Sequence, residues 1–360
     1  MRLLRNYLLV AVALTGLLAI AYILIPTAPL PPGSAPRGYI DMHVHAACIG
    51  VGDSGCFLSP DIFESYKYSF YLRAFGVTEQ ELRSQGDPIV LERLNTQIGQ
   101  STLVDKAVVL ALDGVITNGQ LDRQLTQVYV PNAYLAGELG KYPNLLFGAS
   151  INPYRPDALQ RLETAKLAGA VLIKWIPGIM HIDPADTRLV PFYEKLKELQ
   201  LPLLSHAGQE RSFATSRDEL GDPKRLSLPL ERGVTVIAAH LASTGENEGE
   251  EDFLRLLPMF KQYPNLYADI SSLTQINKLG YLNRTLEEPS IHERLVFGSD
   301  WPLQFFPLVS AWYQLGSVSA GKLKAIAQLE STWDRDVSLK RAMGVPDHVF
   351  ERSRKLLHID

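Results

Sequence analysis

Short apolar runs alternate with amphipathic stretches along most of the chain, and this alternation constrains the fold more than any other feature of the sequence. Eight runs are rich in Val, Ile and Leu: 39–44, 107–112, 145–151, 170–175, 202–205, 235–239, 266–270 and 295–297. Stretches between them, such as 157–167 and 191–199, place apolar residues three and four positions apart, which is the period of a helix. The pattern predicts an α/β fold, a (β/α)8 TIM barrel, which needs ~250 residues plus insertions. An open, doubly wound parallel sheet is the alternative.

The connection after the first run is far longer than an ordinary loop of ~2–6 residues. It extends from Ala46 to Asp105 and contains Tyr66, Tyr68, Phe70 and Tyr71. We expect a helical insertion that forms a lid or one wall of a pocket. An aromatic cluster that only packs the insertion onto the barrel is the alternative.

The first 25 residues contain an apolar segment. From Asn6 to Ile25 there is no charged residue, and this is about the ~20 residues that a helix needs to cross a bilayer. The segment predicts a membrane anchor at 1–25, followed by a Pro-rich linker at 26–37 and a catalytic domain at 38–360. Because Arg2 and Arg5 precede the span, the N-terminus is expected in the cytoplasm and the catalytic domain outside it, in the periplasm or the extracellular space. A signal peptide cleaved near Ala19–Ala21 is the alternative.

Charge excludes one class of partner. The whole chain has a formal charge of −4 and contains no basic run, so a surface that binds nucleic acid through phosphate contacts is not expected. The expected partners are a small-molecule substrate and, through the N-terminal helix, a membrane.

Ionisable residues lie at the ends of several of the apolar runs, where reactive side chains of a barrel are found. His43 and His45 are two positions apart at the end of the first run, so both imidazoles can point to the same side of a strand. Four further residues lie at the ends of later runs: Lys174, His206, His240 and Asp300. A single His at such a position is more often structural, but this convergence predicts a reactive centre at the mouth of the barrel.

Five motifs around these residues resemble those of the metal-dependent amidohydrolase superfamily, in particular its branch of lactonases and decarboxylases. They are DMHVHAA at 41–47, IKW at 173–175, LLSHAG at 203–208, IAAHLA at 237–242 and FGSDWP at 297–302. The resemblance runs from Tyr39 to the end of the chain. It implies one or two divalent metal ions, with Zn²⁺ the first choice, held by His43, His45, His206 and Asp300. Asp300 would also take the proton of the attacking water.

The resemblance leaves two roles open. In two-metal members the histidine of the sixth strand binds a second ion, and a carboxylated lysine of the fourth strand bridges both ions. In one-metal members that histidine is an acid/base group. His240 and Lys174 are therefore expected either to hold a second metal or to act directly in catalysis, with Lys174 turned towards a substrate carboxylate in the second case.

Weaker candidates follow the same strands. Arg211, His181 and Trp301 are considered as substrate-binding residues, and Arg211 would suit an anionic substrate, although residues in such loops are more often solvated. The only two cysteines, Cys48 and Cys56, lie just after the histidine pair. Two cysteines are few for a metal site, so a disulfide is considered there.

Together these features predict a metal-dependent hydrolase that activates water against an ester, lactone or amide carbonyl of a small molecule. A metal-dependent, non-oxidative decarboxylase of a small carboxylic acid is the alternative. A binding protein that has lost turnover would require missing ligands, and none is missing.

Overall fold

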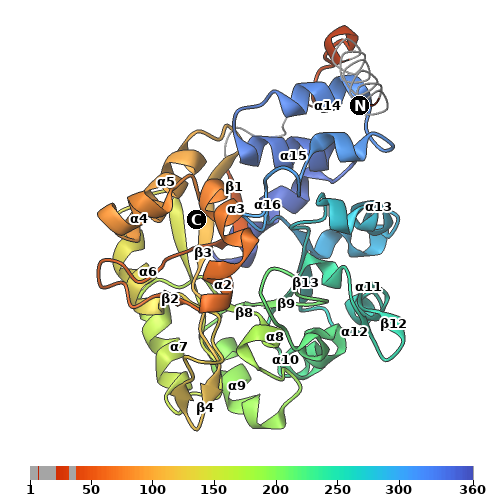
Figure 1. Cartoon of the computed structure of the whole chain (residues 1–360). Helices are drawn as coiled ribbons and strands as arrows, with labels where there is room; N and C mark the ends of the chain where they lie inside the picture. Colours follow the sequence, from red (N-terminus) through yellow and green to blue (C-terminus); the bar gives the residue numbers. More distant parts are fainter. Residues whose placement is uncertain (1–6, 8–21, 32–37, 360) are drawn as a thin grey trace.

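Eight parallel strands form the centre of the molecule (Figure 1). The computed structural model describes residue 7, residues 22–31 and residues 38–359. The strands are β1 (Tyr39–His45), β3 (Val104–Leu110), β7 (Leu145–Ala149), β8 (Leu172–Trp175), β9 (Leu203–His206), β10 (Val236–Ala239), β13 (Leu266–Asp269) and β14 (Leu295–Val296). Each one overlaps one of the eight apolar runs, so the predicted strands are confirmed.

The order of the strands in the sheet is their order in the chain, and every pair of neighbours is parallel. The two edges of the sheet meet. Met42 N donates to Phe297 O (3.3 Å), and His45 N donates to Trp301 O (2.8 Å). The sheet is therefore curled and TIM-barrel-like, as predicted. A doubly wound sheet would instead reverse its strand order.

The two faces of the curled sheet bury different sets of side chains. One face forms an apolar cluster of its own, which includes Ile40, Met42, Leu110, Leu204 and Ile237. Residues on the other face join the larger core beneath the surrounding helices. Successive side chains of a strand point to opposite faces of the sheet, so the apolar residues of each strand are shared between these two clusters.

Helices follow the strands and surround the sheet (Figure 1). They are α6 (Asn132–Leu139), α7 (Ala158–Leu167), α8 (Pro177–Met180), α9 (Val190–Glu198), α10 (Ser227–Glu231), α11 (Asp252–Leu256), α12 (Met259–Gln262), α13 (Tyr281–Leu286), α14 (Ala320–Ala327), α15 (Thr332–Ala342) and α16 (Asp347–Leu356). The two amphipathic stretches at 157–167 and 191–199 correspond to α7 and α9. Short two-residue strands also occur in the loops, among them β2 (Phe57–Leu58) and β6 (Val128–Tyr129), which pair with each other.

The segment after β1 is helical, as predicted. It contains α2 (Pro60–Glu64), α3 (Tyr66–Phe75), α4 (Glu79–Gln85) and α5 (Pro88–Gly99). Helix α3 ends at Gly76, whose positive φ of 73° is the left-handed conformation that commonly closes a helix. Helix α4 starts with a capping box between Thr78 and Glu81.

The predicted membrane-anchored, extracytoplasmic location is contradicted. In the part of the chain that the structure describes, no helix is long and apolar enough to cross a membrane. Only residue 7 and residues 22–25 of the predicted span are described, so most of that segment lies outside the described residues. The end of the span and the residues after it lie against α14: Lys324 Nζ donates to the carbonyl oxygen of Ile25 (2.8 Å), and Ala28 N donates to Gly321 O (3.1 Å).

Candidate metal centre

The end of β1 brings two imidazoles and one carboxylate together. His43 Nε2 and His45 Nε2 are 3.2 Å apart, and Asp300 Oδ1 lies 3.5 Å from the first and 3.2 Å from the second. The register of β1 against β3 shifts between Asp41 and Val44, and Asp300 N donates to His43 O (3.0 Å). The hydrogen bond joins the irregular end of β1 to the chain after β14, so the side chains of His43, His45 and Asp300 meet at one place.

The spacing of these three atoms fits a small divalent cation. Two ligands bound to one tetrahedral zinc ion at ~2.0–2.1 Å lie ~3.3 Å from each other. The three measured separations, 3.2, 3.2 and 3.5 Å, are all close to this value. The residues present therefore suit a metal ion of this size.

A buried carboxylate fixes which nitrogen of His43 faces the centre. His43 Nδ1 donates to Asp269 Oδ2 (2.7 Å), which leaves the lone pair on Nε2. Asp269 also accepts from His240 N (2.8 Å) and from Ser271 Oγ (2.5 Å). Burial opposes its charge, but His43 and these hydrogen bonds hold the pKa of Asp269 well below its usual range.

His206 approaches from β9. Its Nδ1 lies 3.3 Å from Glu210 Oε2, and its Nε2 is buried with no hydrogen-bond partner among the described residues. An unpaired buried nitrogen is costly, and an ion in the centre would satisfy it. Among the described residues, His206 is nevertheless in none of the groups whose ligand atoms all lie within 4.8 Å of one another, whereas His43, His45 and Asp300 form one such group.

His240 also points its Nε2 towards the centre. Ser271 Oγ gives its proton to Asp269, so it accepts from His240 Nδ1 (2.7 Å). The lone pair on His240 Nε2 then faces Asp300 Oδ2 at 4.0 Å. Two acceptors opposite each other require a proton donor or a cation between them. His43, His240 and Asp269 form a second group with metal-ligand spacing.

Lys174 enters the same centre from β8. Its Nζ lies 2.9 Å from His43 Nε2, and its side chain is 1% exposed. Burial lowers the pKa of Lys174 to about 8, while the nearby carboxylates, Asp269 first among them, oppose this. Burial, together with the charge of Lys174, lowers the pKa of His43 to about 4, so its imidazole is neutral at pH 7, the form that binds metals.

Most of the chain matches a family of known proteins. Residues 40–315 match the family model of amidohydrolases, which is more than half of the chain. The chain belongs to the amidohydrolase family. The comparison with curated protein sequences gives no match.

Several solved structures are similar to this amidohydrolase. A TIM-barrel protein of Bordetella bronchiseptica superposes with a TM-score of 0.55 at 15% identity, covering 89% of this chain and 98% of that chain. A putative 2-pyrone-4,6-dicarboxylic acid hydrolase of Pseudomonas putida gives 0.47 at 16% identity, with 89% and 97% covered. A 5-carboxyvanillate decarboxylase of Novosphingobium aromaticivorans gives 0.48 at 12% identity, with 93% and 99% covered.

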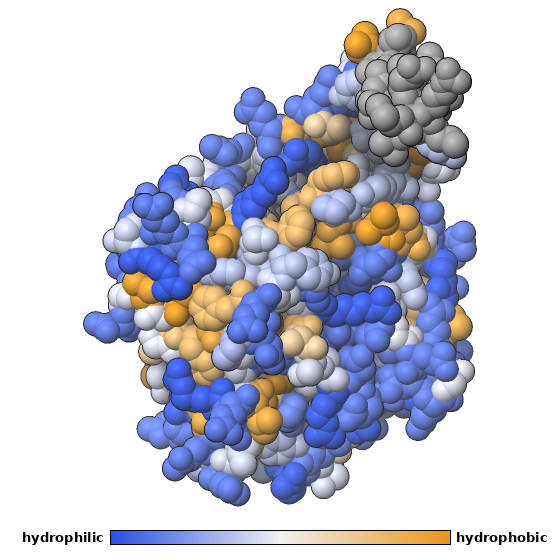
Figure 2. Space-filling model, viewed as in Figure 1, coloured by the Kyte–Doolittle hydropathy of each residue, from blue (hydrophilic) through white to orange (hydrophobic). Residues whose placement is uncertain are grey.

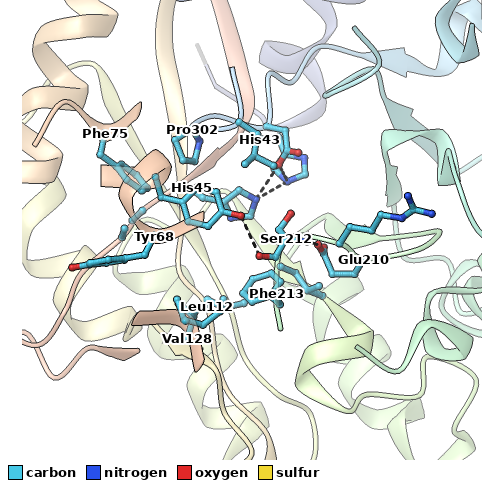
Figure 3. A pocket seen from close by; sticks show the side chains of 18 of the residues that line it. His43, His45, Tyr68, Phe75, Leu112, Val128, Glu210, Ser212, Phe213 and Pro302 are labelled. Atoms are coloured by element: carbon cyan, nitrogen blue, oxygen red, sulfur yellow. Dashed lines mark hydrogen bonds and ion pairs between the residues drawn. The ribbon is translucent and has the colours of Figure 1, made fainter. Parts of the chain in front are cut away.

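A pocket of about 160 Å³ opens onto the metal centre of the amidohydrolase. In Figure 3, Tyr68 and Phe75 lie on one side of His45, and Glu210 lies on the other. Arg211 lines this pocket at its exposed rim, where its guanidinium is held by Gln209 Oε1 (2.6 Å).

The structure places two of the weaker candidates elsewhere. His181 follows α8 and is not among the residues that line the pocket. Trp301 is 2% exposed and packs between Phe75 and Trp333, with ring centres 4.8 and 5.8 Å away, so it supports the wall from behind. Cys48 and Cys56 form a disulfide.

Reasoning from the sequence missed two residues of the site, Asp269 and Lys278, and gave a third, Glu210, too little weight. Asp269 ends the seventh apolar run and could have been found by the rule that identified Asp300. Lys278 lies in the loop after β13, is buried, and donates to Ser272 Oγ (2.8 Å); no spacing signal marked it. Glu210 stands in a loop that we expected to be solvated, yet its side chain is only 8% exposed beside His206.

Asp41 shows the effect of the irregular register. In the structure it accepts from His43 N (3.1 Å) and from Trp333 Nε1 on α15 (2.8 Å), and it contacts no imidazole. Burial raises the pKa of Asp41 to about 6.

Proposed function

We propose that this amidohydrolase is a metal-dependent hydrolase that cleaves an ester, lactone or amide bond of a small molecule. The observation that carries the proposal is the triangle of His43 Nε2, His45 Nε2 and Asp300 Oδ1, with sides of 3.2 to 3.5 Å, at one end of the pocket. His43 Nε2 presents a lone pair, because its Nδ1 donates to Asp269, and the position towards the pocket stays open for substrate.

The chemistry of the donors favours zinc. Imidazoles with one carboxylate suit Zn²⁺, with manganese, iron or cobalt as substitutes. His43, His45, Asp300 and, after a small movement of its ring, His206 would hold the ion. When bound, such an ion activates a water molecule and polarises the substrate carbonyl.

Two side chains of the protein handle protons and charge. Asp300 accepts a proton from the attacking water on Oδ2, the oxygen that faces His240, and passes it to the leaving group. Lys278 contributes positive charge to the pocket and stabilises the negative charge that develops on the carbonyl oxygen. Hydrogen bonds from His45 keep the pKa of Asp300 low in spite of its burial, so it starts the cycle ionised.

Lys174 decides the number of ions. As a carbamate it would be an anionic bridge between two ions, with His240 on the second. As a neutral amine it would leave a single ion and keep His240 as an acid/base group. Native mass spectrometry of the purified protein distinguishes the two states, because only the carbamate adds the mass of carbon dioxide and loses it on acidification.

The first test is metal content. Purified protein should contain one or two equivalents of a divalent ion by elemental analysis, and His43→Ala combined with His45→Ala should remove them. His181→Ala is the matched control, since this histidine lies outside the pocket, and it should retain the metal. Unchanged metal content in the double variant would overturn the assignment of the centre.

The second test is the reaction. A panel of esters, lactones, amides and aromatic carboxylic acids is screened with the metal-loaded enzyme for release of acid and for release of CO₂. We expect acid release that is lost in Asp300→Asn. Release of CO₂ without consumption of water would instead establish decarboxylation, for which the two buried cations Lys174 and Lys278 offer contacts to a substrate carboxylate.

A further inference from the structure

The pocket extends from the metal centre into an apolar compartment under the helical insertion. Six of its apolar lining residues define what we call the insertion chamber: Ile49, Leu72, Phe75, Val90, Leu112 and Val128. They come from the loop after β1, from α3 and α5, and from the segment that includes β6. Figure 2 shows apolar side chains, in orange, over the part of this face where Figure 1 labels α2 and α3.

The two ends of the pocket differ in charge. Every lining residue between 46 and 128 is uncharged, and most are aliphatic or aromatic. The histidine, lysine, arginine and acidic lining residues all come from the ends of the barrel strands or the loops after them; they are His43, His45, Lys174, His206, Glu210, Arg211, His240, Lys278 and Asp300. A ligand that fills the pocket therefore meets charged side chains at one end only, and Tyr68 and Tyr71 bring the hydroxyl groups of the other end.

Contacts across the pocket hold the chamber in place beside the centre. Tyr71 Oη on α3 donates to Ser212 O (3.1 Å), and Lys67 Nζ donates to Arg211 O (2.6 Å). Helix α3 is thus joined to the loop that follows His206. In Figure 3, Phe75 lies on one side of His45, and Leu112 and Val128 lie below it.

The size of the cavity limits what fits. The whole pocket measures about 160 Å³. An apolar protein cavity of ~150 Å³ holds a benzene molecule, and such cavities exclude water unless polar groups line them. A ligand of roughly six carbons in all therefore matches the whole pocket, and the chamber holds the apolar part of it.

We propose that the substrate carries an acyl unit of about six carbons in all, whose compact, uncharged apolar group occupies the insertion chamber while its carbonyl lies at the metal centre. This inference rests on the proposed hydrolase function. The chamber supplies affinity by burying that group, and an ionised or strongly polar group there would find no partner.

Binding of n-alkanoates tests the chamber without turnover. Butanoate, hexanoate and octanoate are titrated into metal-free and zinc-loaded protein at pH 7 by calorimetry. The affinity should rise about fourfold per methylene up to hexanoate and then level off. The same increase in affinity is expected for metal-free and zinc-loaded protein, because only side chains of the protein form the chamber. Equal affinities for butanoate and hexanoate would overturn the proposal.

Two variants change the size of the chamber. Val128→Phe should abolish the gain between butanoate and hexanoate, and Leu72→Ala should move the plateau to a longer chain. Val171→Phe is the matched control, because Val171 is also half-buried but packs against the cluster of Ile40 and Met42, away from the pocket. It should retain the wild-type series. A wild-type series in Val128→Phe would show that the alkyl chain lies elsewhere.

The outcomes separate this inference from the proposed function. Suppose that no ester, lactone or amide is cleaved, but the alkanoate series and its variants behave as expected. The insertion chamber then binds an apolar group, and the hydrolase assignment is wrong. If acetyl and hexanoyl esters are cleaved with the same kcat/KM, the hydrolase assignment is correct, but the insertion chamber does not bind the acyl chain.

Discussion

At the scale of single residues, the centre depends on which nitrogen each imidazole presents. Asp269 holds His43 through Nδ1, Glu210 lies beside Nδ1 of His206, and Ser271 accepts from Nδ1 of His240. In all three residues Nε2 is therefore the atom directed to the centre. Carboxylates and hydroxyls behind a ligating histidine set its tautomer and increase its basicity.

Asp269→Asn is expected to weaken metal binding by ~10- to 100-fold, since the amide no longer accepts from His43 as an anion does. Competition with a fluorescent zinc chelator measures the dissociation constant, and circular dichroism checks the fold. Asp53→Asn, at an exposed loop residue with a positive φ of 57° that asparagine also adopts, is the control. Wild-type affinity in Asp269→Asn would show that the hydrogen bond at 2.7 Å does not position His43.

At the scale of elements, β1 and the chain after β14 must approach closely for the barrel edges to meet. Gly298 follows β14, and a Cβ atom there would lie 2.8 Å from the Cβ of His43 and 3.2 Å from that of Ser271. Lys340 Nζ on α15 donates to the carbonyl oxygen of this glycine (3.0 Å), which holds the segment from the other side. The absence of a side chain at this position is thus part of what brings Asp300 to the histidines.

Gly298→Ala is expected to destabilise the fold by about 1–3 kcal/mol through overpacking and to lower metal affinity, because β1 must move away. Thermal unfolding and chelator competition measure the two effects. Gly137→Ala in α6 is the matched control: nothing lies within 4 Å of the added atom. It should be neutral or stabilising by up to ~1 kcal/mol. A Gly298→Ala protein with normal metal affinity would contradict the expected coupling.

At the scale of the whole molecule, stability depends on pH through acids that folding buries. Asp252 at the start of α11 is 1% exposed and accepts from Asn247 Nδ2 (2.8 Å). Burial, with the nearby Asp222, raises the pKa of Asp252 to about 6, while the hydrogen bond from Asn247 opposes this. The folded state therefore holds this proton more tightly than the unfolded chain, whose carboxyl has the ordinary pKa of about 3.8.

The stabilising contribution of the protonated Asp252 is complete below pH ~4 and is lost as the pH rises through about 6. Asp252→Asn keeps the acceptor but cannot ionise, so it should match the wild type near pH 4 and exceed it by about 1–3 kcal/mol at pH 8. Urea unfolding of both proteins at pH 4, 6 and 8 measures the difference. A constant difference across this range would contradict the titration.

The sequence by itself determined the strands and three residues of the candidate metal centre. Each barrel strand is a short, buried run of Val, Ile and Leu, and such runs are local, so reading the chain in order finds them. His43, His45 and Asp300 follow from the same local rule, because reactive side chains of a barrel lie at the carboxyl ends of its strands. The helical insertion also followed from loop length alone, whereas the anchored location predicted from the first 25 residues was wrong.

Only the tertiary structure decided how these parts combine. The irregular register of β1 turns Asp41 to Trp333 and leaves Asp269, from a strand over 200 residues away, to hold His43. Lys278 reaches the pocket through a loop without periodicity, and the chamber combines α3, α5 and β6. Contacts between segments far apart in the chain depend on packing and on the closure of the sheet, and neither has a local signature in the sequence.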